Sequence, residues 1–81
     1  MKTILVTSLL VGDFFGFFGT EDIYLLRQMS QMIDSKGNVT NVTLIGNYVN
    51  GDLDDEECQL NLVVPGDLVV KLYAREKEEK G

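Results

Sequence analysis

Apolar and polar residues follow different patterns in successive parts of this 81-residue chain. Residues 3–11 are apolar at both odd and even positions, which is typical of a central strand that is covered on both faces. Residues 12–19 follow as a loop in which glycines separate two pairs of phenylalanines. The chain is therefore expected to begin with a buried strand and an aromatic loop.

A helix is predicted after Thr20. This residue is an accepted N-cap, and the acidic residues that follow it suit the positive end of the helix dipole. Lys36 in the last turn and Gly37 just beyond it are typical stop signals. A broad apolar stripe recurs at about 100° per residue between these signals. The stripe consists of Ile23, Leu25, Leu26, Met29, Met32 and Ile33.

Three further strands are predicted, over residues 39–49, 58–64 and 68–75. The last two flank residues 65–67, Pro-Gly-Asp, which have turn chemistry. A three-residue loop at this point sets Val64 opposite Leu68 and gathers the apolar side chains on one face, whereas a two-residue loop mixes the faces. The pattern therefore predicts a hairpin with a three-residue loop.

The connection before this hairpin contains Asn50-Gly51, the strongest two-residue turn signal. Taken alone, this turn sets Leu44 opposite Glu57, so that an apolar face would meet a polar one. A single β-bulge at Gly46 restores the agreement between the faces. The ribbon beyond the bulge is then expected to project from the sheet as a hairpin arm.

The resulting order, β-α-β-β-β, predicts an α+β fold. A four-stranded, at least partly antiparallel sheet would carry one amphipathic helix on one face. Residues 1–75 would form a single domain, and residues 76–81 a charged flexible tail. The alternative is a small SH3-like or Sm-like barrel, because residues 66–69, Gly-Asp-Leu-Val, resemble the turn before the last strand of such barrels. That resemblance covers four residues.

The first residues also resemble a secretory signal, because a lysine precedes an apolar run. The run ends at Gly12-Asp13, and no small-residue cleavage pattern follows it. The same aspartate interrupts the run before the roughly 20 apolar residues of a transmembrane helix accumulate. A buried strand is therefore predicted, in a cytoplasmic protein that does not bind membranes.

Negative charge is concentrated in one short segment. The chain has 13 acidic and 7 basic residues, a net charge of −6. Five acidic residues lie within six positions, namely Asp52, Asp54, Asp55, Glu56 and Glu57. Such a local field repels nucleic acid and favours a basic partner surface. The alternative is that the segment is charged only to stay soluble and to block edge pairing.

Few residues of the chain are suited to catalysis. There is no histidine, and Cys58 is the only cysteine. This excludes the usual zinc sites, nucleophile pairs that depend on histidine, and an intrachain disulfide. The acidic segment offers oxygen ligands for calcium, but its spacing departs from that of an EF-hand loop. We therefore expect no enzymatic activity, no cofactor and no metal.

The phenylalanine pairs, Phe14/Phe15 and Phe17/Phe18, suggest a second contact surface. Neighbouring residues in an extended segment point in opposite directions, so both members of a pair cannot readily face one core. One interpretation places all four in the core of a small domain. The other exposes one member of each pair as a partner anchor.

The predicted sheet also has a face that a single helix cannot cover. This face would be shielded by the phenylalanine loop, by a second copy of the chain or by another protein. Outside the acidic segment, the residues expected to contact a partner are Phe14, Phe17, Tyr48, Val69 and Tyr73.

Together these patterns predict a small protein-binding module without enzymatic activity. It would dock a basic surface of another protein through the acidic hairpin and an apolar patch. In composition the chain is similar to phage-encoded inhibitors, including anti-CRISPR and anti-restriction proteins, although no motif underlies this similarity. The alternative is a structural subunit that forms homo-oligomers, such as a ring or virion component, through a self-complementary sheet face or edge strand.

Overall fold

The computed structural model describes residues 1–49 and 59–75, and these form one antiparallel sheet of six strands. In chain order the elements are β1 (Lys2–Leu5), the 3-10 turn η1 (Val6–Ser8), β2 (Asp13–Gly16), β3 (Tyr24–Ile33), β4 (Val39–Tyr48), β5 (Gln59–Pro65) and β6 (Val69–Arg75). The strands lie in the order β1-β6-β2-β3-β4-β5. β1 and β5 are therefore the edges of the sheet.

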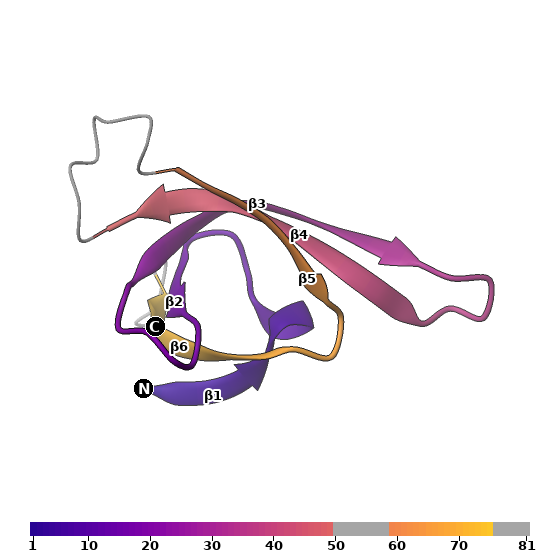
Figure 1. The fold of residues 1–81 in the computed structure, drawn as a ribbon, viewed down its shortest axis with the longest axis horizontal. Coiled ribbons are helices and arrows are strands. Elements are labelled where there is room, and N and C mark those ends of the chain that lie inside the picture. Colours follow the sequence, from indigo (N-terminus) through magenta and orange to yellow (C-terminus); the bar gives the residue numbers. More distant parts are fainter. Residues whose placement is uncertain (50–58, 76–81) are drawn as a thin grey trace, which may run out of the picture.

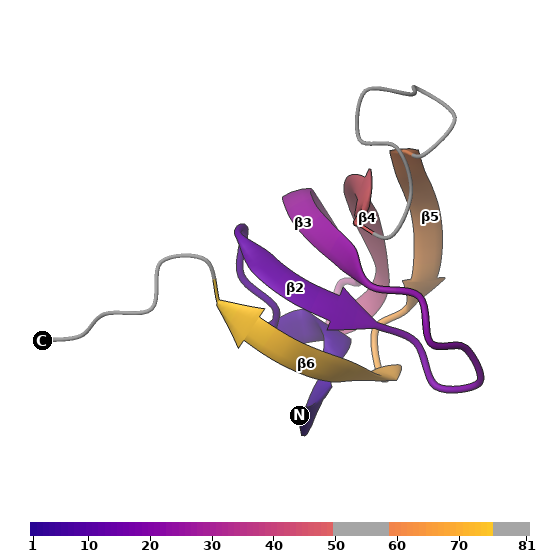
Figure 2. The ribbon, with the colours of Figure 1, turned by 90° about the vertical axis from the view of Figure 1, so that its left-hand side faces the viewer.

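The sheet curls so that its two halves face each other across the interior. β3, β4 and β5 lie on one side, and β1, β6 and β2 lie on the other (Figure 1). Figure 2 shows the same strands fanned around the interior. The apolar residues buried there are Val6, Leu9, Phe15, Leu26, Val42, Leu44, Val64, Val70 and Leu72. The strands β2 to β6 contribute to this core, η1 contributes Val6, and Ile4 of β1 packs against it.

The prediction of an α+β fold with four strands and one amphipathic helix is wrong. The described residues form six antiparallel strands and contain no α-helix. The alternative, a small SH3-like or Sm-like barrel, is nearer because such barrels consist of strands. Within the described part of the chain, however, the sheet keeps two edges, and no strand pairing closes it into a ring.

The segment predicted as a helix is the strand β3. Its register against β4 shifts between Leu26 and Gln28, where a β-bulge inserts one extra residue. Leu26 is the core-facing residue before the bulge, and Met29 is the next one that packs against the core. Core-facing residues of a strand are normally two positions apart, but across the bulge they are three positions apart. A separation of three is typical of the apolar stripe of a helix.

The signals predicted to begin and end the helix belong to turns. The Asp34 carboxylate accepts hydrogen bonds from the backbone N–H groups of Lys36 (2.8 Å) and Asn38 (2.9 Å) in the hairpin between β3 and β4. Gly37 in that hairpin has a φ of 88°, which glycine adopts without strain. In the loop before β3, the side-chain hydroxyl of Thr20 accepts a hydrogen bond from the backbone N–H of Asp22 at 3.3 Å. These residues therefore stabilise chain reversals, and no helix lies between them.

The strand expected over residues 3–11 is interrupted after four residues. β1 ends at Leu5, and η1 then turns the chain toward β2, which lies in the predicted phenylalanine loop. The N–H of Leu9 donates to the carbonyl of Val6 at 3.2 Å, and both side chains are buried. Val6 and Leu9 are the residues of this apolar run that are buried, whereas Leu5, Leu10 and Val11 are exposed. A strand covered on both faces was therefore the wrong interpretation.

β5 and β6 contain the predicted apolar faces but do not pair with each other. β5 pairs with β4, whereas β6 lies between β1 and β2. The turn between them takes the chain from one side of the curled sheet to the other. In this turn the Gly66 N–H donates to the carbonyl of Thr40 at 3.1 Å. Val64 and Val70 consequently share one core from opposite sides. The predicted hairpin is therefore wrong. The apolar faces of β5 and β6 lie on opposite sides of the core and bury each other.

The predicted two-residue turn at Asn50-Gly51 also disagrees with the register. Leu44 lies opposite Leu62, not opposite Glu57, and β4 and β5 pair without a shift. No bulge therefore interrupts this pair at Gly46. The bulge lies instead on β3, and a Cβ atom on Gly46 would collide with the carbonyl of Leu25. Glycine at this position thus allows β3 and β4 to approach closely.

Two predictions fall outside the described residues. The acidic segment of residues 52–57, with its predicted hairpin arm, lies in the stretch between β4 and β5. The predicted charged tail, residues 76–81, follows β6.

Candidate functional site

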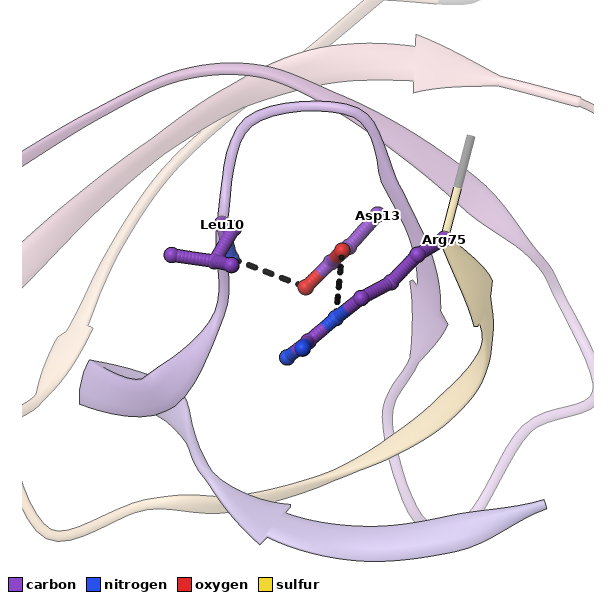
Figure 3. A network of polar contacts seen from close by, with 3 residues as sticks. All are labelled: Leu10, Asp13 and Arg75. Carbon is purple, nitrogen blue, oxygen red and sulfur yellow. Dashed lines mark hydrogen bonds and ion pairs between the residues drawn. The ribbon is translucent and has the colours of Figure 1, made fainter. Parts of the chain in front are cut away.

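Asp13 is the buried charged residue of the described region, with 1% of the residue exposed. One of its carboxylate oxygens accepts the backbone N–H of Leu10 at 2.8 Å, and the other accepts the Nε–H of Arg75 at 3.1 Å (Figure 3). These contacts fasten the loop before β2 to the end of β6. Because both carboxylate oxygens are engaged, we assign Asp13 a structural role.

Four aromatic rings gather on the core side of β2, β3 and β4. The centroids of neighbouring rings among Phe15, Phe17, Tyr24 and Tyr48 lie 5.6 to 5.8 Å apart. The Tyr48 hydroxyl donates to the Asp22 carboxylate at 2.9 Å. Burial raises the pKa of Tyr24 above its ordinary value, and the charge of Asp22 raises it further. Two of the predicted partner contacts, Phe17 and Tyr48, thus lie in a packed cluster that stiffens this end of the sheet.

The outward side of β2, β3 and β4 is hollowed. The hollow has a volume of about 460 Å³ and is lined by Phe14, Leu25, Arg27, Asn47 and Val49. Phe14 lies opposite Leu25 across the β2–β3 pair, and Leu25 lies opposite Asn47 across the β3–β4 pair. Three neighbouring strands therefore align these side chains in one row. A mainly apolar hollow with a few polar groups is the usual form of a site that receives a side chain or small ligand.

A second hollow, of about 630 Å³, lies near the far end of the β3–β4 hairpin. Its lining is mixed in polarity and consists of Ser30, Gln31, Met32, Ile33, Asn41, Thr43 and Val63. Met32 and Ile33 are 65% and 57% exposed. We regard the first hollow as the stronger candidate, because its lining is more apolar and because it reaches Val49, three positions before the acidic segment.

Two other predicted contact residues, Val69 and Tyr73, lie on the outward side of β6. Val69 is 39% exposed, and Tyr73 is half-buried. Between them the Lys71 ammonium donates to the carbonyl of Thr20 at 2.7 Å. The same ammonium lies 5.7 Å from the ring centroid of Phe18 and 5.8 Å from that of Tyr73. Lys71 therefore holds the loop after β2 against this surface.

The four phenylalanines alternate between inward and outward positions. Phe15 is fully buried, and Phe14, its neighbour, lines the outward hollow. Phe17 packs against the core, whereas Phe18 is 53% exposed. One member of each pair therefore faces outward, and in the second pair this member is Phe18 rather than Phe17.

The described residues provide no metal centre. Within residues 1–49 and 59–75, no three histidine, cysteine, aspartate or glutamate side chains come close enough together to hold a metal ion. None of the helical structure in these ranges is long and apolar enough to cross a membrane. Comparison of the chain with protein families, with curated proteins and with solved structures found no match. The residues of the chain themselves are therefore the basis for inferring a function.

Proposed function

We propose that the chain is a small cytoplasmic protein-binding module without enzymatic activity. Its partner presents basic residues next to one large apolar side chain. The observation that carries the proposal is the outward hollow lined by Phe14, Leu25 and Val49, which adjoins the strand end leading to the acidic segment. An apolar pocket surrounded by polar and charged residues is the usual pattern of a protein-binding surface.

The apolar hollow would supply most of the affinity. Burial of a leucine or phenylalanine side chain contributes about 1.5–3 kcal/mol, and the strands that form the hollow hold it open before binding. Behind it, the buried Phe15 and the aromatic cluster support β2 from the core side. Such a preformed site loses little conformational entropy when the partner binds.

The acidic segment would supply orientation and speed of association. Its five carboxylates account for most of the net charge of −6, since the other acidic and basic residues number eight and seven. A concentrated charge attracts a basic surface over about one Debye length, roughly 8–10 Å in physiological salt. By covering a basic surface, the module would exclude other anionic ligands from it, and this is how it would act as an inhibitor.

A peptide selection tests the proposal and requires no identified partner. A displayed library of random peptides is selected against the wild-type chain, and the recovered peptides are expected to combine lysine or arginine with a leucine or aromatic residue. Their affinity should fall about tenfold with Val49→Ser, the equivalent of about 1.4 kcal/mol. It should also fall steeply with added salt.

The matched control is Val63→Ser, which makes the same change at an exposed valine on β5, outside this hollow. It should leave binding unchanged. Recovered peptides without basic residues, or equal losses for both variants, would contradict the proposal.

A further inference from the structure

Among the strands of residues 1–49 and 59–75, β5 is an edge with unusual chemistry. Within these ranges it pairs with β4 alone, so alternate residues direct their N–H and C=O groups away from the described sheet. Exposed edges are normally protected by charges, prolines, bulges or short length. Gln59–Pro65 has seven residues, none of them charged, and it pairs with β4 without a bulge. Its one proline is the last residue, which leaves the six residues before it able to pair with another strand.

The other edge, β1, is protected. It has four residues and begins with Lys2. The η1 turn follows directly and bends the chain away from the strand direction. The two edges of the sheet are therefore not equivalent, and β5 is the one suited to receive another strand.

The core is also incompletely covered at β5. Leu62 lies opposite Leu44 on the same face of the sheet, yet Leu44 is fully buried and Leu62 is 40% exposed. On the outward face of the same strand, Val63 is 59% exposed. An apolar row that begins in the core thus continues to the edge of the sheet and ends in solvent.

We propose that β5 binds the β5 strand of a second copy of this chain, forming an antiparallel two-fold dimer centred on Leu62. In this register Leu62 faces its own counterpart, and Leu60 faces Val64 of the second copy. All core-side pairs are then apolar, and the cores of the two copies become continuous. A slip of one residue would instead set Leu62 opposite Asn61. The sequence of β5 is therefore self-complementary about its central residue.

Charge favours the antiparallel arrangement over a parallel one. The acidic segment precedes β5 in the chain. In an antiparallel pair the two β5 strands begin at opposite ends, so the chain enters them from opposite ends. A parallel pair would bring both acidic segments to the same end, with ten carboxylates together. Because each copy has a net charge of −6, added salt should strengthen the dimer. The peptide binding proposed above should show the opposite dependence on salt.

Sedimentation equilibrium over a range of concentrations, at low and high salt, tests the dimer. The wild-type chain should approach twice its mass of 9.1 kDa, and should do so at lower concentration in high salt. Leu62→Lys sets two like charges face to face and should weaken association by tenfold or more, which corresponds to about 1.4 kcal/mol. The control is Val69→Lys, since Val69 has nearly the same exposure, 39%, on the inner strand β6.

A cysteine cross-link provides a second readout that does not depend on the stability of the lysine variants. Cys58→Ser removes the only cysteine, and Leu62→Cys then places one thiol on the two-fold axis. Opposed Cβ atoms in antiparallel strands are about 4.5–5.5 Å apart, slightly more than the roughly 3.5–4.5 Å that a disulfide spans, so a short cross-linker that reacts with two thiols should join the two copies. Gln59→Cys, far from the axis, should remain unlinked.

A chain that stays monomeric at all concentrations and salt levels would overturn the dimer. So would equal dissociation by Leu62→Lys and Val69→Lys, or equal cross-linking of both cysteine variants. None of these results bears on the hollow, because the dimer does not rest on the proposed partner binding.

Discussion

At the scale of single residues, Asp13 joins segments that are distant in the chain. Its carboxylate bonds to Leu10 nearby and to Arg75, 62 positions later. A buried carboxylate is costly unless it is paired and hydrogen-bonded. The sequence indicated only that Asp13 ends an apolar run, because a contact over 62 positions leaves no local pattern.

Removal of the charge of Arg75 should destabilise the fold. Arg75→Met keeps an unbranched stem but leaves the Asp13 carboxylate without its cation. The expected loss in the free energy of unfolding is about 2–3 kcal/mol, below the full penalty of a buried pair because the Arg75 side chain is 41% exposed. Urea denaturation measures this loss. The double variant Asp13→Asn/Arg75→Met should recover part of it, and strictly additive losses would contradict the coupling.

At the scale of elements, β3 shows why local pattern alone was misleading. The bulge after Leu26 changes the spacing of inward residues from two to three, and the sequence around it is rich in good helix formers. The strand is specified by its partner, because the Thr- and Val-rich β4 pairs with it over nearly its whole length. Strand pairing is a tertiary interaction, and it overrides local helix propensity.

The hairpin between β3 and β4 should make stability depend on pH. The N–H of Asn38, followed by weaker contributions from the Lys36 and Gly37 backbone, holds the pKa of Asp34 below its ordinary value. A carboxyl with a lowered folded-state pKa adds stability that is present above its unfolded pKa and is lost as the pH falls through the folded pKa. Asp34→Asn should therefore be less stable than wild type at neutral pH, and the difference should shrink below about pH 4. Urea denaturation across this range measures the difference, and a constant gap would contradict the assignment.

At the scale of the whole molecule, the apolar faces of β5 and β6 were predicted correctly, but their spatial relation was not. Either a hairpin or two opposed layers would bury Val64 and Val70, and the alternation of residues does not distinguish these arrangements. Of the residues predicted to contact a partner, Phe14 lines the candidate hollow. The other lining residues were missed, namely Leu25, Arg27, Asn47 and Val49. The first two belonged to a predicted helix, and the hollow exists only when three strands align.

The most direct test of the proposed function is to map the binding surface by NMR. A basic peptide that contains one leucine or aromatic residue, taken from the peptide selection, is titrated into the ¹⁵N-labelled chain. The largest shift changes are expected at Phe14, Leu25 and Val49, together with the acidic segment. Changes centred on Met32 and Ile33 in the second hollow, with the first hollow unaffected, would contradict it.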